Sequence, residues 1–139
     1  MTQVNVTKTI NVTATETWNT ISSFEGIENF SPVARSIKTG DGVGALRSCF
    51  LPDDAEIKEE LTVLDNDSMH LQYIITSGPF PIEGYVSDVY VKVVNDNSCE
   101  VSWGSQFTVS GAPEADVIGI FEGFYNAIMN GLESLLQKA

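Results

Sequence analysis

The stretch PEADVIGIFEGFYNAIMNGLESLLQ, residues 113–137, decides the fold. It predicts one long helix, because Pro113 suits the first helical position and Glu114 and Asp116 bring negative charge to the first turn. The expected length is about 37 Å. Its apolar face is wider than the stripe of a helix that lies flat on a sheet, so we expect a curved sheet around it. The residues of this face are Val117, Ile118, Ile120, Phe121, Phe124, Tyr125, Ile128, Met129, Leu132, Leu135 and Leu136.

The sequence before this helix is dominated by strands and turns. Apolar and polar residues alternate around Val4, Val6 and Ile10, and again in 35–39, 45–51, 56–64, 69–76, 85–94 and 99–109. Most connections are too short for parallel crossovers, so the roughly seven strands should be antiparallel. Two short helices are expected between the first two strands, one capped by Thr13 and one over 24–30. The whole chain, 1–139, therefore predicts a single α+β domain.

Composition narrows the classes of partner. The formal net charge is −12, which repels nucleic acid and anionic lipid, and no apolar run approaches the roughly 20 residues that span a bilayer. The cysteines, Cys49 and Cys99, form no CxxC pair, and His70 is the one histidine. We therefore expect no metal site, no cofactor and no membrane insertion. Buried free thiols in a reducing cytoplasm are the expected state of both cysteines.

Glu59 carries the strongest signal of a site. It shares the apolar face of its predicted strand with Ile57 and Leu61, so its carboxylate should point inward and need a partner. A hairpin that turns at Asp53 would place Arg47 directly opposite. Two interpretations have equal weight: the pair forms the polar wall of a ligand cavity, or it only orders the hairpin.

Other side chains should point inward by the same alternation. Most would be ordinary core residues, but the polar and aromatic members would give an apolar pocket a few hydrogen-bonding points. The strand members are Tyr73, Tyr85, Ser87, Trp103 and Ser105, and the helix members are Phe121, Phe124, Tyr125 and Ile128. His70 alternates with Gln72 on the opposite face and should lie at the surface.

Several short sequence motifs occur along the chain in an order that is typical of one superfamily. They are GVGALR at 42–47, EELTVLD at 59–65, GPFPIEGY at 78–85, then Trp103, Phe107 and the final helix. With these markers the whole chain resembles the SRPBCC superfamily, which includes the birch pollen allergen and START lipid-transfer domains. The similarity is greatest to its polyketide cyclase/dehydrase-like branch. The resemblance implies a helix-grip fold with a cavity between the sheet and the last helix, and a cavity-lining glutamate at Glu59.

The resemblance also implies two loops at the mouth of the cavity. In the related abscisic-acid receptors the loops corresponding to 51–54 and 78–81 act as gate and latch, but this sequence keeps only part of the gate motif and none of the latch motif. Phe80, at the tip of the second loop, should either cover a ligand or pack into the core beside its two prolines.

Three functions remain open. The preferred one is a carrier that binds a small hydrophobic or amphipathic molecule, because the sequence shows no reactive constellation. The second is a cyclase or dehydratase acting on a polyketide-like or aromatic substrate, with Glu59 as acid or base. The third is a domain with a nearly filled cavity that acts through protein contacts. A cavity well below ~300 Å³ would rule out both ligand-based functions. A monomer or a weak homodimer is expected.

Overall fold

Seven strands, two α-helices and one short 3₁₀-helix make up the structure, a computed structural model that describes residues 1–138. In chain order these elements are β1 (Thr2–Ile10), α1 (Ala14–Ser22), η1 (Ile27–Asn29), β2 (Arg35–Thr39), β3 (Leu46–Phe50), β4 (Glu56–Asp65), β5 (His70–Ser77), β6 (Ile82–Asn95), β7 (Ser98–Val109) and α2 (Glu114–Gln137).

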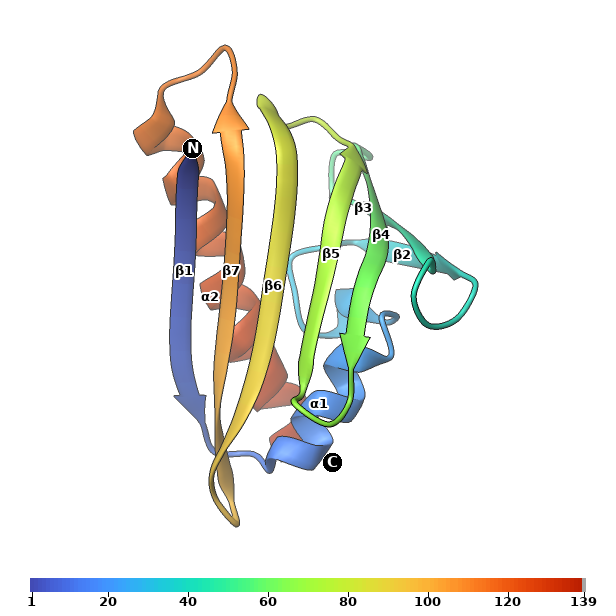
Figure 1. The fold of residues 1–139 in the computed structure, drawn as a ribbon, viewed down its shortest axis with the longest axis vertical. Helices are drawn as coiled ribbons and strands as arrows, with labels where there is room; N and C mark the ends of the chain where they lie inside the picture. Colours follow the sequence, from blue (N-terminus) through green and yellow to red (C-terminus); the bar gives the residue numbers. More distant parts are fainter. Residues whose placement is uncertain (139) are drawn as a thin grey trace.

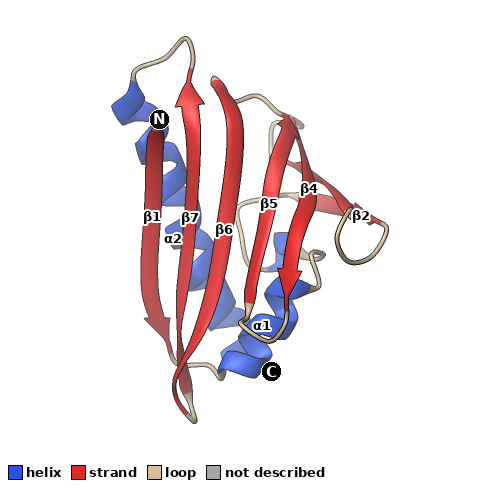
Figure 2. Ribbon diagram, viewed as in Figure 1, coloured by secondary structure: helices blue, strands red, loops and turns tan. Residues whose placement is uncertain are grey.

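The strands form one antiparallel sheet in the order β1-β7-β6-β5-β4-β3-β2. The first strand therefore pairs with the last, and α2 crosses one face of the curved sheet behind β1, β7 and β6 (Figure 1). The two helices lie on the same side of this sheet (Figure 2). The predicted helix-grip architecture is confirmed.

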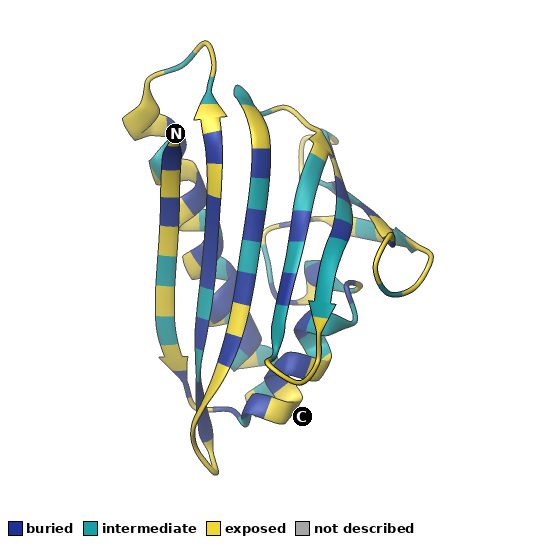
Figure 3. Cartoon of the chain, viewed as in Figure 1, coloured by how far each residue is buried: buried dark blue, intermediate teal, exposed yellow. Residues whose placement is uncertain are grey.

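The alternation of the strands decides which side chains are buried. Buried and exposed residues follow one another along β1 and β6 (Figure 3). The inner face of β1 includes Lys8, whose half-buried stem lies along the sheet while its ammonium donates a hydrogen bond to Asn130 of α2. Its place in the apolar series of β1 is thereby explained.

The segment between α1 and β2 differs from the prediction. Thr13 caps α1 as expected, because its hydroxyl oxygen accepts a hydrogen bond from the Glu16 amide at 3.2 Å. The predicted helix over 24–30 is wrong: only the three residues of η1 are helical. Phe24 and Gly26 have φ angles of 57° and 70°, and this left-handed backbone interrupts a right-handed helix.

The start and the apolar face of α2 also need correction. Pro113 lies before the first helical residue with an extended backbone, so the helix begins at Glu114. Fewer apolar side chains of α2 are buried than expected. Val117 and Phe121 are buried, but Ile120 is 49% exposed. The sheet therefore covers a narrower face of α2 than the sequence suggested.

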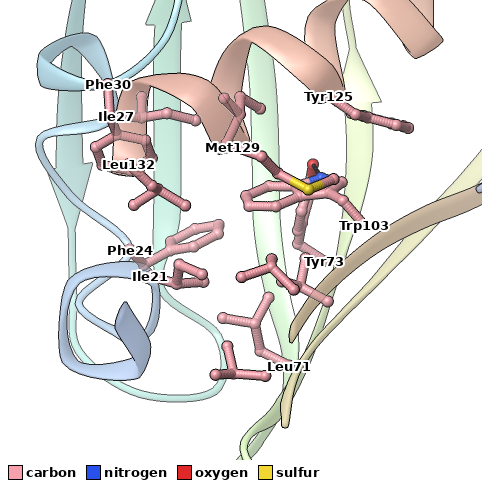
Figure 4. Packing of buried hydrophobic residues seen from close by; sticks show 14 of the residues in the cluster. Ile21, Phe24, Ile27, Phe30, Leu71, Tyr73, Trp103, Tyr125, Met129 and Leu132 are labelled. Carbon is pink, nitrogen blue, oxygen red and sulfur yellow. Dashed lines mark hydrogen bonds between the residues drawn. The ribbon is translucent and has the colours of Figure 1, made fainter. Parts of the chain in front are cut away.

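Gly131 lets α2 approach the segment around η1. A Cβ atom at Gly131 would lie 2.2 Å from the Phe30 carbonyl oxygen, and Phe30 and Ile27 face this part of α2 (Figure 4). Gly131→Ala should therefore lower the free energy of unfolding, by about 1–3 kcal/mol, because backbone rather than a movable side chain must give way. Urea denaturation would measure the change.

Gly123→Ala is the matched control, because a Cβ there meets no atom within 4 Å. Replacing an exposed helical glycine by alanine should raise stability by about 0.5–1 kcal/mol. Equal responses of the two variants would contradict the proposed close approach.

Candidate ligand pocket

The register of the β3–β4 hairpin brings Arg47 and Glu59 together as a buried ion pair. Arg47 pairs with Glu59 across β3 and β4, and Cys49 pairs with Ile57. The Arg47 Nε atom donates to Glu59 Oε1 at 2.7 Å, and the Cys49 thiol donates to the same oxygen at 3.4 Å. Both charged residues are buried. The predicted pairing of Arg47 with Glu59 is confirmed.

Aromatic rings hold the guanidinium of Arg47 in place. Its Cζ atom lies 4.0 Å from the centre of the Phe24 ring and 5.4 Å from that of Tyr73. Burial lowers the pKa of Arg47 and is the largest single effect, but Glu59, Cys49 and Tyr73 together outweigh it, so the pKa of Arg47 is raised. Burial, reinforced by the charge of Glu59, raises the pKa of the Cys49 thiol. The thiol thus remains a neutral donor beside the ion pair.

Three buried tyrosines form the rest of the polar wall. Tyr85 and Tyr125 share a hydrogen bond between their hydroxyls, and Tyr125 donates to Ser105 Oγ at 2.7 Å. The Trp103 indole nitrogen donates to the Tyr73 hydroxyl at 3.1 Å, next to α2 (Figure 4). Burial raises the pKa of Tyr73 to about 12, with the charge of Glu59 as the second cause. Burial also raises the pKa values of the other two tyrosines, so all three phenols are neutral near pH 7.

These groups border a small apolar pocket between the sheet and α2. The lining residues that the sequence singled out are Glu59, Tyr73, Phe80, Tyr85, Phe121, Phe124 and Tyr125. Sequence reasoning missed Ile27, Val33, Cys49, Ile57, Ile75 and Ile120. Cys49 and Ile57 lie on the same inward faces as Arg47 and Glu59, so the alternation could have found them. Val33 and Ile27 come from an irregular segment without a period.

The other predicted residues lie elsewhere. Arg47 lies behind Glu59 against Phe24, and Ile128 belongs to the solid core. Ser87 donates to the Gly104 carbonyl oxygen at 2.8 Å. Trp103 and Ser105 also lie outside the pocket lining. The Trp103 indole donates a hydrogen bond to Tyr73, and Ser105 accepts one from Tyr125. As ligand contacts, all of the named residues stay predictions.

The pocket is nearly filled. Its free volume is about 30 Å³ for water-sized spheres. This is room for roughly one or two water molecules, whereas pockets for drug-sized ligands measure about 300–1,000 Å³. Neither ligand-based function is possible in this closed conformation, so each of them requires the pocket to open.

Only one of the two predicted loops borders the pocket. Phe80, in 78–81, is half-buried, and its ring centre lies 5.1 Å from that of Phe121. The residues of 51–54 form a turn closed by a hydrogen bond from the Asp54 amide to the Leu51 carbonyl oxygen and contribute nothing to the pocket lining.

Beside Phe80 the sheet itself opens. The pairing of β5 with β6 ends at Ile74 and Val86, although both strands continue. A bulge in β6, with Gly84 at a φ of 67°, accompanies the divergence. The hollow between the strand ends measures about 280 Å³ and shares Ile75, Phe80 and Tyr85 with the pocket.

The family model described as polyketide cyclase / dehydrase and lipid transport matches residues 1–137. The chain belongs to this family. The resemblance to the SRPBCC superfamily is thereby confirmed. Family and fold together support a ligand-binding role in general terms. No curated protein sequence matches the chain closely enough to be counted as a relative.

Solved structures share the fold over nearly the whole chain. The protein XoxI from Bacillus cereus has 25% sequence identity and a TM-score of 0.90, with 99% of this chain and 96% of that chain covered. An uncharacterized protein from Bacillus thuringiensis has 24% identity and a TM-score of 0.89, covering 98% and 99%. Norcoclaurine synthase from Thalictrum flavum, in complex with dopamine and hydroxybenzaldehyde, has 15% identity and a TM-score of 0.77, covering 99% and 87%.

Residues 1–138 contain neither a membrane-crossing helix nor a cluster of metal ligands. No helix in this range is long and apolar enough to cross a bilayer. The same range holds no group of three or more His, Cys, Asp or Glu side chains arranged to bind a metal ion.

The buried pair can be tested by unpairing it. Arg47→Met should lower the free energy of unfolding by about 3–5 kcal/mol, because it leaves Glu59 buried without its partner. The double variant Arg47→Met/Glu59→Leu should recover most of that loss, since it removes both charges. Thermal or urea denaturation at pH 7 measures both. A loss below about 1 kcal/mol for Arg47→Met would place the pair in solvent-like surroundings.

The buried tyrosines predict a loss of stability in alkali. An unfolded tyrosine has a pKa of about 10, so above that pH the unfolded chain releases protons that the folded protein retains. The free energy of unfolding should therefore fall as the pH rises from about 10 towards 12, where Tyr73 titrates in the folded state. Urea titrations across this range would measure the slope.

Tyr73→Phe should lessen this slope, although loss of the bond from Trp103 lowers its stability at every pH. An unchanged slope in this variant would show that Tyr73 makes no such contribution.

Proposed function

We propose that this protein binds and carries a small, mainly apolar ligand with a hydrogen-bond donor, in the pocket between the sheet and α2. The observation that carries the proposal is that one carboxylate oxygen of Glu59, Oε2, has no hydrogen-bond partner among the described residues, in a pocket lined mainly by apolar side chains. Arg47 and Cys49 both bind Glu59 Oε1, and Oε2 has no hydrogen bond within residues 1–138. Every fully buried side-chain nitrogen and oxygen in this range has a partner, so Oε2 is not fully buried, and we infer that it faces the pocket, whose lining includes Glu59.

This arrangement suits a ligand with one polar end. Arg47 orients the carboxylate before a ligand arrives, which reduces the ordering that binding requires. A hydroxyl or amine could donate to Oε2 while its apolar body lies against Ile57, Ile75 and Phe121. The strongly acidic surface disfavours anionic ligands, so a neutral or cationic molecule fits best.

Binding requires the pocket to open, because about 30 Å³ excludes even a fragment-sized ligand. Phe80 lines both the pocket and the hollow between β5 and β6, as do Ile75 and Tyr85. If the Phe80 ring moves away from Phe121, the two spaces become continuous. Phe80 is thus proposed as the gate, with the 78–81 loop as its support.

Catalysis would require Glu59 and the tyrosines to act on a substrate as well as bind it. A cyclase or dehydratase needs an acid or base at the reacting atom and, in addition, groups that polarise the substrate. In the closed pocket the Tyr85 hydroxyl is hydrogen-bonded to the Tyr125 hydroxyl, and the Tyr73 hydroxyl accepts a hydrogen bond from Trp103. These hydroxyls are therefore already engaged by the protein. The geometry therefore favours binding over a reaction.

The cysteines support a cytoplasmic location for this function. Cys49 and Cys99 are both free and buried. Free thiols are the ordinary state in a reducing compartment.

The gate can be tested with naphthol, a fluorescent apolar molecule with one donor. Phe80→Ala should increase its association rate about tenfold, because the ring no longer has to move. Naphthol should also bind about tenfold more tightly than naphthalene, since a hydrogen bond to a charged acceptor contributes about 1.5–3 kcal/mol. Stopped-flow and equilibrium fluorescence measure the two effects.

Phe50→Ala is the matched control, because Phe50 stacks with Arg35 outside the pocket, with the guanidinium 3.7 Å from the ring centre. Its association rate should equal that of the unchanged protein. If neither the unchanged protein nor Phe80→Ala binds naphthol or naphthalene, the pocket is only core and the proposal fails.

A further inference from the structure

Strand β2 is an open edge of the sheet. It pairs with β3 on one side, and it ends the strand order, so no other strand within residues 1–138 covers its free side. The β2–β3 hairpin projects at the side of the molecule away from α2 (Figure 1). A free edge presents backbone donors and acceptors that can pair with another chain.

This hairpin also exposes apolar side chains. Ile37 is 54% exposed, Leu46 is 50% exposed, and Val43 in the connecting turn is 63% exposed. Ile37 and Leu46 lie on the outer face of the sheet and border a surface hollow with Phe50. Clustered apolar side chains beside an open edge mark a contact surface.

The charge at this edge also permits contact between two copies. The chain has nineteen Asp and Glu residues and a net charge of −12, so most surfaces of two copies repel each other. Strands β2 and β3 contain no acidic residue; their charged side chains are Arg35, Lys38 and Arg47. Arg47 is buried against Glu59, and Lys38 forms an ion pair with Asp41 at 3.1 Å. The hairpin is therefore a place where two copies can approach with little repulsion. Strand β1, the other edge, also lacks acidic residues, but it exposes no large apolar side chain.

The sequence of β2 is complementary to itself in one antiparallel register. Pairing centred on Ile37 places this residue opposite Ile37 of the second copy, and Arg35 opposite Thr39. Ser36 then lies opposite Lys38, so no like charges face each other. The Ser36 hydroxyl donates to Glu28 at 2.5 Å, which puts a carboxylate near the incoming Lys38.

We propose that two copies of this chain form a symmetric dimer by antiparallel pairing of β2 with β2, centred on Ile37. The two sheets then become one continuous sheet across the two-fold axis. The contact is short, so the dimer should be weak and form as concentration rises. No residue of β2 lines the ligand pocket.

An engineered disulfide tests the register. In antiparallel pairs the opposed Cα atoms are about 4.5–5.5 Å apart, which suits a disulfide. Under mild oxidation Ile37→Cys should therefore give a covalent dimer, at least about tenfold faster than a control cysteine that meets its mate only by collision. Val43→Cys is that control, since it is exposed on the same hairpin but away from the axis. Cys49 and Cys99 are buried and should not react.

Sedimentation equilibrium of the protein without added cysteines provides a second test. Its mean mass should rise with concentration, and Ile37→Lys should stay monomeric with an unchanged circular dichroism spectrum, because the exposed Ile37 contributes little to the core. Equal crosslinking rates for Ile37→Cys and Val43→Cys, or a monomer at every concentration, would overturn the proposal. A dimer that persists in Ile37→Lys would show that another surface is used.

Discussion

The apolar face of α2 must be removed from water, and this constraint shapes the rest of the molecule. A flat sheet would leave part of that face wet, so the sheet curves, and its first strand returns to pair with the last. Val117, Phe121 and Tyr125 then lie against the sheet. Where β5 and β6 diverge the covering is incomplete, and the pocket lies at that place because helix and sheet pack less closely there.

The sequence was sufficient to predict what depends on local periodicity. All seven strands were predicted because one face of each strand is less exposed than the other, even in β2, where exposed and half-buried residues alternate. The two-residue alternation of the sequence reflects that difference. The contact between Arg47 and Glu59 was predictable for a related reason. A short turn sets the register of the β3–β4 hairpin, and a shift of one residue would have moved Glu59 to the wet face.

What could not be predicted depends on partners distant in the sequence. Phe24 adopts a left-handed backbone beneath the guanidinium of Arg47, and no local pattern announces that contact. Trp103 and Ser105 do point inward as predicted, but side chains of other elements engage their polar atoms. Alternation tells which way a side chain points, whereas its hydrogen-bond partner is decided by the assembled fold. The sequence could therefore not show which polar groups remain free in the pocket or how much room the pocket leaves.

The closed pocket has a polar wall that resists opening and an apolar side that does not. Separating Arg47 from Glu59 would leave buried charges unpaired at a cost of about 3–5 kcal/mol. Separating Tyr125 from Ser105 would cost about 1–3 kcal/mol. Parting Phe80 from Phe121 forfeits only an aromatic contact worth about 0.5–1.5 kcal/mol beyond its buried area, and Phe80 is already half-exposed to solvent. The less costly motion is thus at Phe80. A ligand admitted there would direct its polar end toward Glu59 and leave its apolar end near Phe80. The polar end loses its water when it is buried, and a hydrogen bond to Glu59 compensates for that loss.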